Sequence, residues 1–129
     1  MTTTHTDQDV SDVTDLRCEG LVNPLGIDVT EPRLSWRMSS NANGAAQTSY
    51  RVLCATAPRL LKEGAADLWD SGKITTGQSQ HVRYLGKALS RGVPCHWTVR
   101  IWDDDDVASV WATPAIWTTF DLATDRDWQ

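Results

Sequence analysis

The sequence predicts an all-β fold in which two antiparallel sheets pack face to face. Short runs of alternating apolar and polar residues recur along the chain, and residues that favour turns separate them. Only residues 58–63 (PRLLKE) carry a helical signal, so strands do not alternate with helices as they do in a parallel α/β fold. The 129 residues fit one domain, and a domain of this size can bury a substantial core without disulfide bonds.

Two strands are expected before residue 40. In the first, Leu16, Cys18 and Gly20 share one face of the alternation. In the second, Leu34 and Trp36 alternate with polar residues and give the strand one apolar face. Each strand is therefore expected to lie against the core on one side and to face solvent on the other.

The middle of the chain is expected to contain a central strand with short elements after it. Residues 39–47 are polar with a Gly, which is typical of a hairpin connection. The strand over residues 48–56 that follows has apolar side chains on both faces, which favours a position inside a sheet. Residues 58–63 indicate one or two helical turns, and residues 68–73 a short strand that runs into a tight turn.

The strongest strand signal begins after Pro94 and follows a short strand at residues 80–84. One face of it carries a continuous apolar set, namely Cys95, Trp97, Val99 and Ile101. Residues 103–106, four consecutive Asp, are expected to form a hairpin-like loop. A last strand spans residues 110–120, and Pro114 within it indicates an edge or a bulge.

These elements amount to about seven antiparallel strands, which fits an immunoglobulin or fibronectin type III β-sandwich. Trp36 and Trp97 lie on inward faces and are expected to be the core pair, with Tyr50 beside them. The inter-sheet cystine pattern of true immunoglobulin domains is missing, so the fibronectin-like variant is favoured. Cys18, Cys54 and Cys95 form an odd, widely spaced set, which favours buried free thiols, with one disulfide as the alternative.

Charge and hydropathy exclude several classes of partner. The formal net charge of −5 argues against nucleic acid or an anionic membrane surface as the main partner. No stretch approaches the roughly 20 apolar residues that span a bilayer. The first residues show no basic and then apolar leader pattern, so a cytoplasmic location is expected. No cofactor is expected either, because the sequence contains no glycine-rich phosphate loop.

Five segments together resemble the opening of bacterial α-L-rhamnosidases of glycoside hydrolase family 78. They are LRCEGLVNPLGIDVTEPRLSWRM (16–38), QTSYRVLCAT (47–56), LWDSGKI (68–74), CHWTVRIWD (95–103) and WATPAIW (111–117). The resemblance covers residues 16–120 and implies an N-terminal fibronectin-type β-sandwich. Residues 1–13 are expected to be a disordered tail, 14–121 the sandwich and 122–129 the start of a linker to a further domain.

The resemblance implies that the chemistry lies elsewhere. Enzymes of that family hydrolyse terminal α-L-rhamnosyl bonds with inversion, using acidic residues in a downstream (α/α)6 barrel, and none of that domain is in this chain. No catalytic, cofactor-binding or metal-ligating residue is therefore assigned. The family often has a Gly-containing turn where this chain has Asp103 to Asp106, so the shape of that loop is open.

The one predicted contact site combines Trp102, Asp103 and Asp104. Trp102 is on the face opposite Trp97 and just before the acidic loop. Three uses are open for it: packing on a neighbouring domain, packing under a neighbouring strand, and stacking on a sugar. The acidic run is interpreted as a solvated turn rather than a calcium loop, because its four carboxylates are consecutive and not spaced.

Two further groups of residues resemble a metal site and a catalytic motif, but a structural role suits each of them better. His81, Cys95 and His96 do not suit a shared metal ion, because Cys95 and His96 point to opposite faces of one strand. Residues 70–73 (DSGK) suit a β-turn rather than a catalytic motif.

Three hypotheses for function follow. The first is a non-catalytic N-terminal module of an α-L-rhamnosidase-like glycoside hydrolase that packs on the downstream domains of the same polypeptide. The second is a carbohydrate-binding module for rhamnosylated glycans. The third is a generic fibronectin-type domain with a protein partner.

Overall fold

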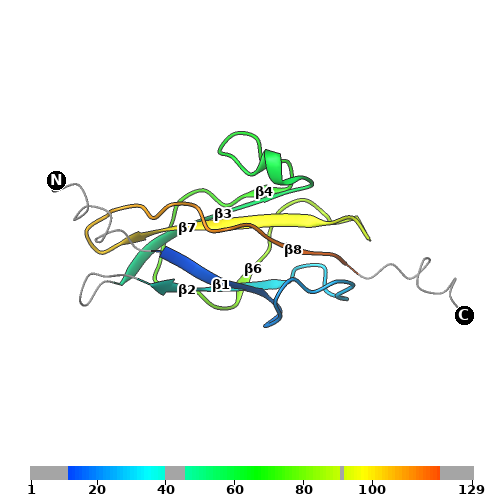
Figure 1. Ribbon diagram of the computed structural model, residues 1–129, viewed down its shortest axis with the longest axis horizontal. Coiled ribbons are helices and arrows are strands. Elements are labelled where there is room, and N and C mark those ends of the chain that lie inside the picture. The colour runs from blue at the N-terminus through cyan, green and yellow to red at the C-terminus, as the bar shows by residue number, and fades with distance from the viewer. Residues whose placement is uncertain (1–11, 40–45, 91, 120–129) are drawn as a thin grey trace, which may run out of the picture.

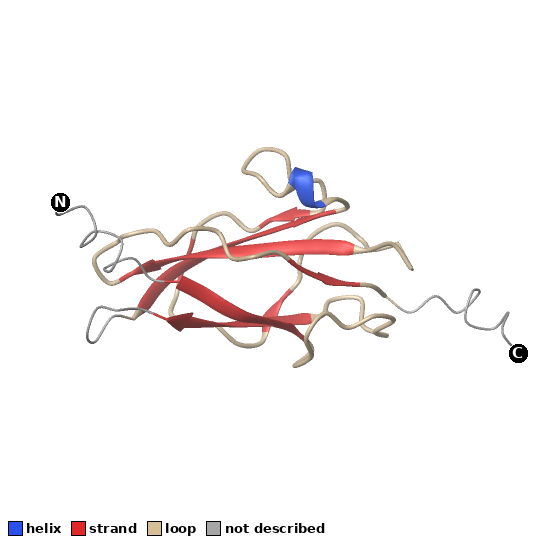
Figure 2. Ribbon diagram, in the orientation of Figure 1, coloured by secondary structure: helices blue, strands red, loops and turns tan. Residues whose placement is uncertain are grey.

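The computed structural model describes residues 12–39, 46–90 and 92–119, which form two antiparallel sheets packed face to face (Figure 1). The small sheet has the order β1-β2-β6, with β1 at Asp12–Cys18, β2 at Arg33–Ser39 and β6 at Val82–Arg83. The only helix in these residues is the single 3-10 turn η1, Pro58–Leu60 (Figure 2). It is far too short to cross a bilayer. The predicted all-β sandwich is confirmed.

The large sheet is built around two long strands, β3 at Gln47–Ala55 and β7 at Cys95–Asp103. They pair over their whole lengths, and the sheet order is β4-β3-β7-β8. The short strands are β4 at Trp69–Asp70, β5 at Ile74–Thr75 and β8 at Ala115–Trp117. β5 also pairs with β3. The prediction of a central strand with two apolar faces is confirmed, since β3 is bordered by strands on both sides and both of its faces are largely buried.

The connection across residues 39–47 is not a hairpin, which corrects the prediction. β2 belongs to the small sheet and β3 to the large one, and they do not pair. The chain therefore crosses between sheets at this point, which a polar, Gly-containing composition alone does not reveal. Most of the connection lies outside the described residues.

β1 begins earlier than predicted and contains a bulge. It starts at Asp12, so Asp12 and Val13 belong to the sandwich and not to the tail; residues 1–11 lie outside the described part. The pairing with β2 shifts between Thr14 and Arg17, and Asp15 there has φ +53°. Leu16 and Cys18 are buried as expected, but Gly20 lies exposed in a turn with φ +77° and is not on the inward face.

β8 is an edge strand, as Pro114 indicated, but only three residues of the predicted 110–120 segment pair as a strand. Its outer edge is covered by the loop after β1. Asn23 Oδ1 accepts a hydrogen bond from the Ile116 amide at 3.1 Å, and Pro24 O accepts one from the Thr118 amide at 3.2 Å. The Gly26 amide in turn donates to Thr118 O at 3.0 Å. This covering satisfies backbone groups that an edge strand would otherwise expose.

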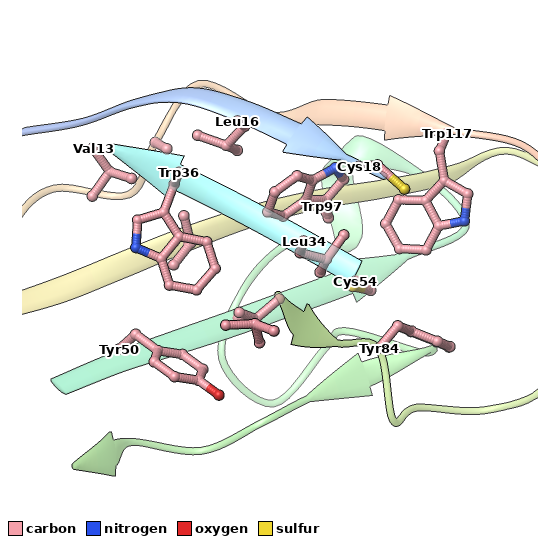
Figure 3. Packing of buried hydrophobic residues seen from close by; sticks show 14 of the residues in the cluster. Val13, Leu16, Cys18, Leu34, Trp36, Tyr50, Cys54, Tyr84, Trp97 and Trp117 are labelled. Carbon is pink, nitrogen blue, oxygen red and sulfur yellow. The ribbon is translucent and has the colours of Figure 1, made fainter. Parts of the chain in front are cut away.

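Aromatic side chains fill the core between the sheets. Trp36, Trp97 and Trp117 are almost completely buried and follow one another along the core (Figure 3). Trp36 packs edge-on against Tyr50, with ring centroids 5.2 Å apart, and Trp97 packs in the same way against Trp117 at 6.3 Å. Trp36 and Trp97 are core residues as predicted, but each has a different aromatic partner, and Trp117 is a third anchor that the sequence analysis did not name. Cutting such a residue to Ala typically costs about 3–5 kcal/mol of folding free energy.

The three cysteines are free and buried, as predicted. Burial raises the pKa of the Cys18 thiol to about 12 and raises that of Cys54 as well. Both thiols therefore stay protonated at neutral pH and act as small apolar core side chains.

Candidate functional site

Trp102, the aromatic residue of the predicted contact site, is half-buried at the end of β7. Lys73 Nζ lies 4.7 Å from the centre of its ring, and the same ammonium forms an ion pair with Asp106 at 2.9 Å. A cation already occupies part of the ring face, so a sugar would have to displace Lys73 to stack there.

Asp103 is 4% exposed and serves the turn that follows β7. Its Oδ1 accepts hydrogen bonds from the backbone amides of Asp105 at 2.9 Å and Val107 at 3.0 Å. Asp104 is exposed beside it. Trp102 and Asp104 are therefore partly accessible, whereas the Asp103 side chain stabilises the turn. Contact of this site with a sugar or a neighbouring domain stays a prediction.

Carboxylate oxygens of Asp103, Asp104 and Asp105 lie within 4.8 Å of one another. One oxygen of the Asp103 carboxylate already accepts two amide hydrogen bonds. Such an oxygen has little capacity left for a cation, and a calcium ion needs six to eight oxygen ligands. The arrangement favours the solvated turn that the sequence indicated.

Three carboxylates elsewhere in the described residues pair with arginine or hydroxyl groups. The Arg33 guanidinium and amide lower the pKa of Glu19, Thr56 lowers that of Asp67, and Arg51 lowers that of Asp70. An inverting glycosidase needs one carboxyl group whose pKa is raised, so that it can donate a proton, across a gap from a second that activates water. These three carboxyls have the opposite perturbation and cannot supply the acid.

The other two sequence candidates have structural roles. Cys95 is fully buried while His96 is half-buried on the opposite face of β7, so they do not converge on one ion. The segment after Asp70 is a tight turn in which Asp70 Oδ1 accepts a hydrogen bond from the Gly72 amide at 2.9 Å. Gly72 has φ +69°, a conformation that glycine adopts without strain.

A cleft of about 390 Å³ opens at the side of the sandwich where β4 and β5 of the large sheet face β6 of the small one. Tyr50 and Trp69 contribute its aromatic lining, and Gln78 and His81 come from the segment between β5 and β6. The sequence does not predict this cleft. Its residues come from β3, β4, β5, β6 and the loops beside them, and no local sequence pattern predicts that these segments converge.

Exposed aliphatic residues gather at the end of the sandwich where the chain leaves β8, which we call the exit end. Leu21, Val22 and Leu25 in the loop after β1 are 54%, 59% and 73% exposed, and Val93 before β7 is 41% exposed. Both loops are tied to the last described residues, because Thr118 bonds the first loop and the Gly92 amide donates to Thr119 O at 3.2 Å. In Figure 1 these loops lie at the right, on the same side as the C-terminus.

Comparisons with known proteins agree with this architecture. The family described as "Rha78A-like, N-terminal immunoglobulin domain" matches residues 13–121. An α-L-rhamnosidase of Streptomyces avermitilis is 41% identical over 107 residues, which is 83% of this chain and 10% of that protein. An α-L-rhamnosidase of Alteromonas sp. is 36% identical over 112 residues, which is 86% of this chain and 12% of that protein.

Solved structures show the same relationship. The crystal structure of the Streptomyces avermitilis α-L-rhamnosidase complexed with L-rhamnose matches with a TM-score of 0.81 at 39% identity, covering 86% of this chain and 11% of that one. The α-L-rhamnosidase of Dictyoglumus thermophilum matches with a TM-score of 0.80 at 30% identity, covering 84% and 12%. The chain thus spans about a tenth of the length of the relatives it matches. It belongs to the family of Rha78A-like N-terminal immunoglobulin domains.

Proposed function

We propose that this chain is the non-catalytic N-terminal module of an α-L-rhamnosidase-type glycoside hydrolase and that it packs on the downstream part of the same polypeptide. The relatives it matches are α-L-rhamnosidases, of which it corresponds to about a tenth. On this proposal, terminal rhamnosyl bonds are cleaved by residues outside this chain.

The observation that carries the proposal is the exit end. Isolated exposed aliphatic residues are common on protein surfaces, but a group of them around one point indicates a contact surface. Leu21, Val22, Leu25 and Val93 surround the point where the chain leaves the sandwich. Polypeptide that follows this point begins next to the surface, so it reaches the surface at a high effective concentration.

The chemistry of the described carboxylates supports the non-catalytic part of the proposal. Glu19 and Asp70 each bind an arginine side chain, and Asp67 binds Thr56. All three therefore favour the ionised form and lack the proton that a general acid must give to the leaving group. The ionised state of these three carboxyls therefore supports a non-catalytic module.

A graft into a characterised relative tests the proposal. The 107-residue matching segment of the Streptomyces avermitilis enzyme is replaced by the corresponding part of this chain. Hydrolysis of 4-nitrophenyl α-L-rhamnoside is then measured for the graft, for the relative lacking the segment and for this chain alone. We expect the graft to keep activity within about threefold of the intact relative, since a 0.6 kcal/mol change alters a rate about threefold.

We expect the relative without the segment to lose thermal stability and this chain alone to be inactive. Hydrolysis by the isolated chain in proportion to its concentration would overturn the non-catalytic assignment. A graft that is no more stable than the deletion would overturn the packing assignment.

A further inference from the structure

The cleft between β4, β5 and β6 has the composition of a small-molecule site. Its volume of about 390 Å³ falls within the roughly 300–1,000 Å³ typical of such sites. An aromatic wall and aliphatic residues make up much of the lining, and a few polar groups project into it. A site of this kind recognises a ligand with both an apolar face and hydrogen-bonding groups.

Trp69 is held rigidly as one wall of the cleft. Its ring packs edge-on against Tyr84, with centroids 5.4 Å apart. Tyr84 is fixed in turn by a hydrogen bond of 2.6 Å from its hydroxyl to Lys87 O. Gly86 packs so closely that a Cβ there would lie 2.4 Å from Trp69 Cβ. The indole is only half-buried, so part of it faces the cleft as a preorganised flat surface.

Polar groups in the lining keep hydrogen-bonding capacity. The ring of Tyr50 is buried, and its hydroxyl makes no hydrogen bond with the residues that the structure describes. Figure 3 shows this hydroxyl pointing away from Trp36. Gln78 Nε2 donates to Gln80 O at 2.9 Å and to His81 O at 3.2 Å, which fixes the amide and leaves its Oε1 as an acceptor. The lining that includes Trp69 thus also contains one residue that can donate a hydrogen bond and one that can accept.

The carboxylate and the guanidinium of the lining, Asp70 and Arg83, are each paired with a residue of opposite charge. Asp70 binds Arg51 through both carboxylate oxygens, at 2.8 and 2.6 Å, and Arg83 forms an ion pair with Glu31. A charged ligand would find no unpaired partner among these residues and would lose its hydration on entry. The cleft therefore selects for a neutral ligand.

We infer that this cleft binds a neutral pyranose ring, whose C–H face packs on Trp69 and whose hydroxyl groups bond to Tyr50 and Gln78. A pyranose combines an apolar face with hydroxyl groups at its edge, as the lining requires. The inference goes beyond the proposed function, because packing at the exit end does not depend on it. Trp102, the aromatic residue that the sequence suggested for a sugar, lies outside this lining.

Titration of the ¹⁵N-labelled 129-residue chain with L-rhamnose, D-glucose and D-glucuronate tests the inference. We expect the neutral sugars to shift the Trp69 indole and Gln78 side-chain amide resonances saturably, with Kd on the order of 1–10 mM for a ligand of this size. D-glucuronate is expected to bind at least about tenfold more weakly, because Arg83 of the lining is already paired with Glu31 and the carboxylate would lose its hydration.

Two variants and a matched control identify the site. We expect Trp69→Ala to abolish the shifts at Gln78. Tyr50→Phe keeps the packing and loses only a hydroxyl, and we expect it to raise Kd about three- to tenfold. Trp102→Ala removes an indole that does not line the cleft and is expected to leave Kd unchanged. Backbone spectra and unfolding midpoints report whether each variant is folded.

Saturable shifts that disappear in Trp69→Ala and weaken in folded Tyr50→Phe would support the site. An absence of shifts up to 50 mM of either neutral sugar would overturn it, as would binding that Trp102→Ala abolishes and Tyr50→Phe leaves intact. Failure here would leave the graft experiment untouched, since that experiment measures stability and rhamnoside hydrolysis.

Discussion

The three core tryptophans differ in whether their indole N–H groups have a hydrogen-bond partner. Trp36 Nε1 donates to Gln47 Oε1 at 2.9 Å, and Gln47 Nε2 donates onward to Gln78 O at 2.7 Å. The buried Nε1 atoms of Trp97 and Trp117 have no hydrogen-bond partner in the described residues. Leaving a buried donor unsatisfied costs about 1–3 kcal/mol, so Trp97 and Trp117 stabilise the fold through packing despite this cost.

Phenylalanine substitutions measure this difference. Trp36→Phe and Trp117→Phe remove the same atoms from almost fully buried positions. Only the first removes a hydrogen bond, so we expect it to lower the unfolding free energy by about 1 kcal/mol more than the second. Urea denaturation of both variants checks the prediction, and equal losses would contradict it.

Gly86 has almost no room for a side chain. A Cβ at this position would lie 2.5 Å from Leu68 O and 2.7 Å from the Tyr84 hydroxyl oxygen. We expect Gly86→Ala to cost about 1–3 kcal/mol of stability by forcing the neighbouring backbone apart. The control is Gly77→Ala, whose nearest neighbour, Gln47 O, would be 3.2 Å away. Thermal unfolding of the two variants measures the loss of stability. A loss at Gly77 as large as that at Gly86 would show that close packing around Gly86 is not the cause.

At the scale of elements, an ion pair joins β3 to β4. The Arg51 guanidinium holds the pKa of Asp70 below its usual range in the folded state. A lowered folded pKa means that the pair stabilises the fold above about pH 4 and that this stabilisation disappears as pH falls through the folded pKa. We expect Asp70→Asn to lose about 1 kcal/mol at pH 7, and the loss should shrink towards pH 3.

Urea unfolding at pH 7, 5 and 3 measures this dependence. Asp104→Asn is the control, because Asp104 is exposed and forms no ion pair among the described residues. A stability loss for Asp70→Asn that is the same at every pH would show that the pair's charge is not responsible.

The covered edge of β8 is a second feature at this scale. Asn23 has φ +48° and accepts the hydrogen bond from the Ile116 amide. Asn23→Gly tolerates that φ while removing the acceptor, so we expect hydrogen exchange at Ile116 to become about 5–10-fold faster. The Ala112 amide, which donates to Val99 O at 3.0 Å, is the internal control. An Ile116 exchange rate that does not change would mean that the loop does not protect this edge.

Alternation predicted the long strands well and the connections poorly. Trp36, Trp97 and Ile101 lie on the faces that a period of two assigns to them. The predicted hairpin between β2 and β3 is wrong, because a polar loop can join strands of one sheet or of two. The bulge at Asp15 was missed for a similar reason, since it depends on pairing with β2 and not on local composition.

At the scale of the whole molecule, neither the cleft nor the exit end can be predicted from local sequence patterns. The cleft brings Tyr50 of β3 next to Gln78, and the exit end brings Leu25 next to Thr118, so each depends on tertiary folding. The single aromatic candidate that the sequence suggested, Trp102, lies in the strong strand β7, where the alternation alone assigns it to a face. A strand pattern assigns a face to each residue, but it does not say which loops meet.

Hydrogen–deuterium exchange of the isolated chain and of the graft in the Streptomyces avermitilis enzyme tests most directly whether the exit end packs on downstream polypeptide. We expect exchange in residues 21–27 and 92–93 to slow by at least about tenfold in the graft, with little change in the acidic turn at Asp104 and Asp105. Leu25→Asp in the graft should reverse most of that protection. Equal exchange of the exit end in both contexts, or protection that appears only at the acidic turn, would contradict the proposal.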